Sequence, residues 1–135
     1  MSNSFQLEIV TPQRKQFNGS AVSVSCPGAQ GRFQVLHSHA PFLSTLAVGM
    51  VKVQDAEGLE IRFAISGGIA QVFHNQMRVL ADSAERADQI DVARAERARQ
   101  RAEERLAAHS AEVDEERAHA ALLRAINRLK IARGE

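Results

Sequence analysis

The sequence has 135 residues and a mass of 14.8 kDa, which is the size of one ordinary domain or two very small ones. Its 17 basic and 16 acidic side chains give a formal net charge of +1, which argues against a protein that coats nucleic acid or an anionic membrane through bulk charge. No apolar run is long enough to cross a bilayer, and the single cysteine, Cys26, excludes an internal disulfide and a zinc site built from cysteines. Since the N-terminus also lacks the pattern of a secretory signal, we expect a cytosolic protein.

The composition changes abruptly near residue 83. Residues 1–83 carry 6 basic and 5 acidic side chains, whereas residues 84–135 carry 11 of each. All three prolines, all six phenylalanines and seven of the eight glycines lie in the first part. We therefore predict two domains that are built differently, residues 1–84 and residues 85–135.

The first part has the two-residue periodicity of strands with one buried face. Apolar and polar residues alternate in residues 5–9, 22–24, 50–53 and 61–65. Turn-forming residues recur between these runs, at Pro12, Gly19, Pro27-Gly28, Pro41, Gly49, Gly67-Gly68 and His74-Asn75. This pattern predicts roughly six to ten short strands in an antiparallel β-sandwich or small barrel.

The second part is typical of two helices. No glycine or proline occurs from Ala84 to Arg133, and alanine, arginine and glutamate dominate. Residues 107–111 are expected to form the turn of an antiparallel hairpin. The expected contact faces are rich in alanine, with Val92, Ala95, Ala98, Ala102 and Leu106 on the first helix and Ala118, Leu122, Ala125, Leu129 and Ala132 on the second. Small side chains bury little area, so we expect the hairpin to be held weakly and to be able to move.

Helix caps are also predicted. Asp88, with the acidic Asp91 three residues later, is expected to cap the first helix, and either Ser110 or Asp114 is expected to cap the second.

Catalysis and metal binding find no support in the sequence. His37, His39 and His74 lack a cysteine or carboxylate nearby that would complete a ligand set, so they are interpreted as structural or surface residues. The segment Gly28–Arg32 lacks the ending of a phosphate-binding loop and is interpreted as a turn. No nucleophile motif is present, so the protein is not expected to be an enzyme or to hold a metal.

The arginines of the second part are more informative. Arg94 and Arg101 share a sector of the first helix with Asp91, and one face of the second helix carries Arg117, Arg124 and Arg128. Guanidinium groups that converge from two helices suit a polyphosphate, which each can bind through two hydrogen bonds. The alternative is that these arginines pair with carboxylates one turn away and only solubilise the helices. Nucleic-acid binding is disfavoured, because no aromatic residues interleave with the arginines.

Two long segments resemble the epsilon subunit of bacterial F-type ATP synthase. They are GAQGRFQVLHSHAPFLSTLAVGMVKV, residues 28–53, and SGGIAQVFHNQMRVLADSAERADQID, residues 66–91. They stand in the right order and are followed by a helical hairpin of the right length, so the resemblance covers essentially residues 4–133.

The resemblance implies a fold and a role. The fold is a β-sandwich followed by a two-helix hairpin, and the role is that of a non-catalytic rotor subunit in the central stalk, peripheral to the cytoplasmic face of the bacterial inner membrane. The sandwich would sit against the gamma subunit and the c-ring, and the hairpin would restrain wasteful ATP hydrolysis. In the restraining state the hairpin extends beside gamma, where Arg117, Arg124 and Arg128 would meet acidic residues of a catalytic beta subunit, next to alpha.

Some members of that family bind ATP on the folded hairpin, and a motif Ile/Leu-Asp-x-x-Arg-Ala marks them. Here the motif is residues 90–95. The implied ligand is ATP as a regulatory molecule, and the implied binding residues are Glu85, Ile90, Asp91, Arg94, Arg101, Arg124 and Arg128. ATP would favour the folded hairpin and permit hydrolysis. Two alternatives stay open: a purely structural coupling subunit without useful nucleotide binding, and an unrelated sandwich with a helical oligomerisation tail.

The sequence departs from the family pattern in the loop that is expected to face gamma and the c-ring. That loop carries Gly31, Arg32, His39 and Pro41. Arg32 stands where an acidic residue is common, and Gln34 stands where a glycine is common. The charge reversal at Arg32 puts that particular contact in doubt, or implies a complementary change in the c-ring.

Overall fold

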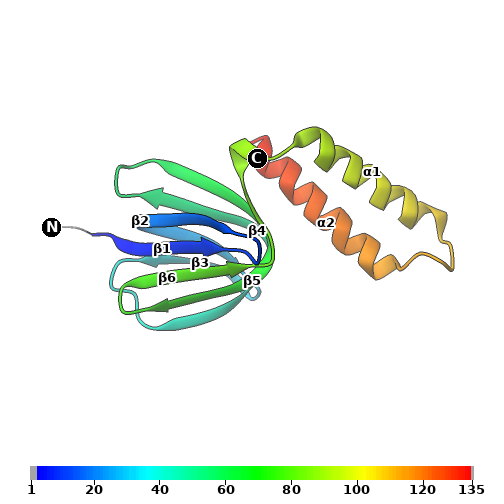
Figure 1. Cartoon of the computed structure of the whole chain (residues 1–135). Coiled ribbons are helices and arrows are strands. Elements are labelled where there is room, and N and C mark those ends of the chain that lie inside the picture. The colour runs from blue at the N-terminus through cyan, green and yellow to red at the C-terminus, as the bar shows by residue number, and fades with distance from the viewer. Residues whose placement is uncertain (1–2, 135) are drawn as a thin grey trace. The chain divides into compact units, whose positions relative to one another are not determined.

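The computed structural model describes residues 3–134, and the contacts within it divide the chain into two units. We call residues 3–86 the sandwich unit and residues 87–134 the hairpin unit. Each unit is described by itself below. The predicted fold class, a β-sandwich followed by a two-helix hairpin, is confirmed (Figure 1).

The sandwich unit is a single sheet that closes on itself. Its strands are β1 (Phe5–Val10), β2 (Lys15–Gly28), β3 (Gly31–Leu36), β4 (Phe42–Asp55), β5 (Glu60–Phe73), β6 (Gln76–Ala81) and β7 (Ala84–Arg86). The strand order is β1-β6-β5-β4-β2-β3, and β1 also pairs with β2, while β7 pairs with β5. In the ring β1-β6-β5-β4-β2 every strand therefore has a hydrogen-bonded neighbour on both sides. Few of its backbone N–H and C=O groups are left to pair with a strand of another molecule.

One pairing differs from the expected antiparallel arrangement. β1 and β6 run parallel, with Leu7 opposite Met77 and Ile9 opposite Val79. The reason is geometric, because a ring of five strands cannot alternate in direction all the way round. No crossover helix is needed, since the intervening strands of the ring make the connection.

The core of the sandwich follows from the alternation along the strands. Phe5, Leu7 and Ile9 of β1 point inward, as do the alternate residues Met77 and Val79 of β6. Phe63 of β5 is fully buried, and its ring makes an edge contact with Phe17, with 6.2 Å between the ring centroids. Together these inward faces make one apolar core.

Three strands are longer than the turn signals predicted. β2, β4 and β5 have 14 residues each and run through Gly19, Gly49 and Gly67-Gly68, which were expected to be turns, while Pro27-Gly28 forms the end of β2. At Gly68 the backbone has φ +139°, and a Cβ there would lie 2.2 Å from the carbonyl oxygen of Leu80. At Gly49 a Cβ would lie 2.6 Å from the Cβ of Pro27. These glycines allow neighbouring strands of the sheet to approach each other closely.

The hairpin unit contains a short 3₁₀ turn, η1 (Ala87–Gln89), and two helices, α1 (Val92–Ala108) and α2 (Glu115–Ala132). The helices lie side by side and run in opposite directions (Figure 1). Asp91 caps α1 and Asp114 caps α2, each accepting a hydrogen bond from the third backbone amide of its helix. The predicted cap Asp88 is wrong, because the chain makes the short turn η1 at that residue and α1 begins only at Val92. Of the two predicted caps for α2, Ser110 instead accepts a hydrogen bond from the Glu112 amide inside the connecting turn.

Candidate functional site

The two helices of the hairpin meet through small side chains. The buried residues of α1 are Ala95 and Ala102, and those of α2 include Ala118, Ala125 and Leu129. Val92 was expected on the contact face of α1 but is 43% exposed. It lies three residues before the buried Ala95 and therefore at the edge of that face. An interface made mainly of alanine lets the helices approach closely but contributes little apolar burial.

The start of α1 is built from the motif at residues 90–95. The Asp91 carboxylate accepts a hydrogen bond of 3.0 Å from the backbone amide of Arg94, as an N-cap does. Ile90, just before the cap, and Ala95, in the next turn, are both buried and occupy the two positions of a hydrophobic staple. Three residues of the motif therefore have a structural role that requires no ligand.

The four predicted ATP-binding arginines lie on the same side of the hairpin. Take the buried alanines of each helix as the zero direction. Arg94 and Arg101 then point roughly 100–120° away from it around the axis of α1. Arg124 and Arg128 point roughly 80–120° away from it around the axis of α2, with the same sense of rotation. Because the helices are antiparallel, equal rotations in the same sense bring side chains out on the same open side. We call this the basic side; it also carries Arg105 and Arg117.

The contacts between the ends of the helices set their offset. Arg133 contacts Glu96, and His109 contacts Glu115, so Arg101 lies level with the stretch of α2 between Arg124 and Arg128. Arg94, Arg101 and Arg124 are exposed and Arg128 is half-buried. The arrangement can present several guanidinium groups to one anion.

The opposite side of the hairpin carries a network of ion pairs. Glu96 accepts hydrogen bonds from Arg99 and, across the hairpin, from Arg133 at 3.1 Å, while Arg99 also pairs with Glu103. Hydrogen bonds from Arg99, together with the charges of Arg99 and Arg133, hold the pKa of Glu96 below its usual value. Glu96 and Glu103 are thus held in ion pairs with arginines of their own side of the hairpin.

A shallow hollow of about 420 Å³ lies along α1. Its lining comprises Arg94, Arg97, Gln100, Arg101 and Glu104, all from this one helix. Arg97, Gln100 and Glu104 were not among the predicted site residues. The signal that could have found Arg97 is its spacing, since positions i, i+3 and i+7 share one helical face.

The remaining predicted ATP-binding residue, Glu85, lies in β7 of the sandwich unit, half-buried in the strand pair with β5. Within the hairpin unit the structure groups Arg94 with Arg101 around the hollow and brings Arg124 and Arg128 to the same side. Arg117, predicted with Arg124 and Arg128 to contact a partner, is exposed near the start of α2.

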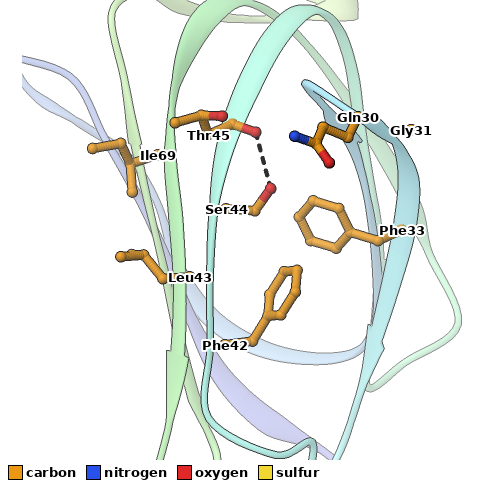
Figure 2. A pocket seen from close by; sticks show the side chains of 8 residues that line it. All are labelled: Gln30, Gly31, Phe33, Phe42, Leu43, Ser44, Thr45 and Ile69. Carbon is orange, nitrogen blue, oxygen red and sulfur yellow. Dashed lines mark hydrogen bonds between the residues drawn. The ribbon is translucent and has the colours of Figure 1, made fainter.

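The sandwich unit has a hollow of its own, of about 530 Å³ (Figure 2). Phe33 of β3 and Phe42 of β4 lie close together in it, with their ring centroids 5.0 Å apart, and Leu43 and Ile69 lie to one side of both rings. Polar groups of the rim come from Gln30, Ser44 and Thr45. This is a mostly apolar surface beside the predicted loop.

The four predicted loop residues do not lie in one loop: Gly31 and Arg32 belong to β3, and His39 and Pro41 lie between β3 and β4. Gly31 lines this hollow. His39 makes an edge contact with the ring of Phe42, with 5.7 Å between the centroids. Pro41 is exposed and directly precedes β4. Arg32 is folded back onto the sheet, where its guanidinium donates to the Ser25 hydroxyl at 2.9 Å and to the Met50 carbonyl at 2.8 Å.

Within residues 3–134, no group of three or more histidine, cysteine, aspartate or glutamate side chains is placed to hold a metal ion. Neither helix of that described part is both long and apolar enough to span a membrane.

Each of the two units matches a family model of known proteins. A family model described as "ATP synthase, Delta/Epsilon chain, beta-sandwich domain" matches residues 4–87, and one described as "ATP synthase, Delta/Epsilon chain, long alpha-helix domain" matches residues 88–133.

Relatives of nearly the same length carry one name. The chain is 46% identical over 132 residues to the ATP synthase epsilon chain of Desulforamulus reducens, covering 98% of this chain and 99% of the relative. It is 47% identical over 131 residues to the ATP synthase epsilon chain of Nitratidesulfovibrio vulgaris, covering 97% of each. Its fold resembles a chain in the Euglena gracilis mitochondrial ATP synthase, with a TM-score of 0.78, 19% identity, and coverage of 91% of this chain and 78% of that one.

Proposed function

The chain belongs to the ATP synthase delta/epsilon family, and on that premise we propose that it is a rotor subunit in the central stalk of a proton-translocating F-type ATP synthase. The resemblance seen in the sequence is thereby confirmed, and as an epsilon chain the protein is a non-catalytic subunit. In this proposal it couples proton flow to ATP synthesis at the cytoplasmic face of the bacterial inner membrane. Its partners are the gamma subunit, the c-ring, and the beta and alpha subunits.

The sandwich unit is the part that docks on the rotor. Its support is the mostly apolar surface beside the predicted loop, where Leu43 is 69% exposed and Ile69 is 42% exposed. Large apolar side chains grouped on one exposed face are typical of an interaction surface. The Arg32 side chain is hydrogen-bonded to Ser25 and Met50 of the same sheet and does not extend toward a partner. The charge reversal at this position therefore changes the docking surface less than an arginine that projects into solvent would.

The hairpin unit is the regulatory part, and the one observation that carries its role is the segregation of charge across it. The basic side presents the arginines of both helices, while the carboxylates on the other side are held in ion pairs. ATP bound by Arg94, Arg101, Arg124 and Arg128 needs both helices together, so ATP favours the folded hairpin. When ATP is scarce the hairpin extends, and Arg117, Arg124 and Arg128 meet acidic residues of a beta subunit and inhibit hydrolysis.

A second candidate is a structural coupling subunit that never binds nucleotide usefully. The observation that favours it is the start of α1, where Ile90, Asp91 and Ala95 serve as cap and staple. The motif is therefore explained by helix formation alone, and only the arginines argue for a ligand.

Calorimetric titration of the full chain with ATP separates these candidates. The regulatory proposal predicts saturable binding at millimolar ATP or below. It also predicts a loss of at least about tenfold in affinity for Arg124→Ala plus Arg128→Ala, since each removes charge-assisted hydrogen bonds to phosphate. The matched control is Arg14→Ala plus Lys130→Ala, which removes the same charge from exposed positions outside the basic side and should change affinity by less than about twofold.

Absence of saturable heat at millimolar ATP would leave only the structural candidate. An equal effect of the two double variants would show that net charge, not a built site, attracts the nucleotide.

A further inference from the structure

A proline interrupts the sandwich sheet close to the hollow of that unit. Pro27 lies inside β2 and is buried, although proline has no backbone N–H to donate to a neighbouring strand. Beside it, Arg32 of β3 donates hydrogen bonds to the Ser25 hydroxyl and to the Met50 carbonyl. We propose that Arg32 is a positioning residue of the docking surface, which supplies the donor that Pro27 lacks and thereby holds the strand pair β2–β3 against β4. The proposal deepens the docking part of the proposed function and rests on it only for the identity of the partner.

The missing donor lies on the β4 side of β2. Pairing between β2 and β3 is continuous through Pro27, which stands opposite Arg32. Pairing between β2 and β4, in contrast, shifts register between Ser25 and Gly28. A proline breaks the hydrogen-bond ladder on the side toward which its nitrogen points, so the shift indicates that this nitrogen faces β4. The close approach of Pro27 to Gly49 shows that β2 and β4 still touch at that point.

The Met50 carbonyl is the acceptor on β4. Met50 follows Gly49 and lies in the stretch of β4 that has no pairing partner in β2. On its other edge β4 stays paired with β5, where Met50 lies opposite Ala64. The carbonyl accepts from the Arg32 guanidinium at 2.8 Å, a normal length for a hydrogen bond from nitrogen to oxygen. This bond therefore pairs a carbonyl group for which the neighbouring strand offers no donor.

The Arg32 side chain reaches the carbonyl across the outward face of β2. Ser25 lies between the buried Val24 and Cys26 and so points to that outward face. Its hydroxyl accepts from Nη2 of Arg32 at 2.9 Å and from Nε at 3.3 Å, which fixes the guanidinium over β2. A guanidinium carries several donors in a planar fork, so one side chain can serve both acceptors. An acidic side chain, which is common at this position in the family, has no donor for the Met50 carbonyl.

The position of the strand pair β2–β3 decides the shape of the hollow (Figure 2). The residues that line the hollow from this side are Gln30, Gly31 and Phe33, and β4 lines the other side. Within the described residues β3 pairs with β2 and not with β4. The strand pair is joined to β4 by the hydrogen bond from the Ala29 amide to the Thr45 carbonyl, 3.0 Å long, and by Arg32. Arg32 therefore contributes to docking through the shape of the hollow and not through its charge.

The first test is hydrogen exchange of the β3 amides in the full chain. Arg32→Met keeps the length of the side chain, removes its donors and should speed exchange about fivefold, the effect of about one lost hydrogen bond. Arg32→Lys keeps a donor and should retain most of the protection. Pro27→Ala returns a backbone N–H to β2, so in that background Arg32→Met should speed exchange by less than about twofold. Arg14→Met, which removes the same charge from an exposed position between β1 and β2, is the control and should stay within about twofold of the unaltered chain.

The second test is rebinding of each variant to an ATP synthase that has been stripped of this chain. Arg32→Met and Arg32→Glu should weaken rebinding to a similar extent, about fivefold, because both remove the donor. Pro27→Ala should reduce both losses. A much larger loss in Arg32→Glu than in Arg32→Met, which Pro27→Ala leaves unchanged, would show that a partner meets the charge and would overturn the proposal.

Exchange of the β3 amides that is no faster in Arg32→Met than in Arg14→Met would also overturn it. So would an effect of Arg32→Met that persists in full in the Pro27→Ala background. Failure of the unaltered chain to rebind would count against the proposed function, and the exchange measurement would still decide the role of Arg32. Circular dichroism of each variant confirms that the sandwich remains folded.

Discussion

The guanidinium of Arg133 lies 3.1 Å from the carboxylate of Glu96 and so joins the end of α2 to the beginning of α1. Glu96 is also bound by Arg99 of its own helix, which holds the carboxylate in place. The interhelical pair sits at the open end of the hairpin, where the helices must part if the hairpin extends. Both side chains are partly exposed, so the pair contributes a small and salt-sensitive preference for the folded state.

Glu96→Gln is expected to loosen the hairpin and to remove part of its acid sensitivity. The arginines hold the pKa of Glu96 below its ordinary value near 4.5, so the ion pair stabilises the folded hairpin fully above that pH. The contribution is lost as the pH falls from about 4.5 through the lower pKa of the folded state. Hydrogen exchange of the α2 amides as a function of pH measures this.

Glu112→Gln, in the exposed connecting turn, is the control for Glu96→Gln and should leave the exchange profile unchanged. An acid dependence that persists unchanged in Glu96→Gln would refute the role of this pair.

Ala102→Leu is expected to destabilise the folded hairpin by about 1–3 kcal/mol, because a larger side chain overpacks an interface built for close approach. Ala107→Leu adds the same atoms at an exposed position of α1 and should be nearly neutral. Protease sensitivity of α2, compared between the two variants, gives the readout. Equal sensitivity would mean that the alanine faces do not set the packing.

Asp91→Ala and Asp91→Asn separate capping from ligand binding. Loss of the cap in Asp91→Ala should cost about 1 kcal/mol of helix stability, whereas asparagine caps nearly as well as aspartate. If Asp91 acts only as a cap, Asp91→Asn should keep both the thermal stability of the hairpin and its ATP affinity. A fall in ATP affinity without a fall in stability would assign the carboxylate a direct contact with the ligand.

The period of two in the sequence was sufficient to predict the sandwich, because each strand buries one face. It could not predict the parallel pair β1–β6, since pairing between residues about 70 positions apart leaves no local signature. The glycines at 49 and 68 were interpreted as turn residues. Glycine is required there because Pro27 and the Leu80 carbonyl approach the backbone closely, and that approach depends on how the sheet closes.

The arginine faces were predictable because helical spacing alone sets them. The difference between Arg97 and Arg99 was also predictable and was missed. Arg99 has Glu96 three residues before it and Glu103 four residues after it, whereas no carboxylate lies three or four residues from Arg97. In contrast, the structural use of Arg32 was not predictable, because it depends on Met50, 18 residues away in the chain.

Cys26 is expected to be inert in the folded protein. Burial raises the pKa of its thiol to about 12, despite the nearby charge of Arg32, so the reactive thiolate is scarce and enclosed at neutral pH. A thiol reagent at pH 8 should react only after denaturant unfolds the sandwich. Stoichiometric reaction without denaturant would contradict the burial of Cys26.

That inertness allows selective labels in the hairpin for the most direct test of the central claim. Ala93→Cys and Lys130→Cys place two exposed thiols near the open end, away from the basic side. The distance between spin labels at these positions is measured with and without ATP, in the otherwise unaltered chain and in Arg124→Ala plus Arg128→Ala. The regulatory account predicts that ATP increases the short-distance population in the former and not in the latter. A distance distribution that ATP leaves unchanged, while calorimetry shows ATP bound, would contradict it.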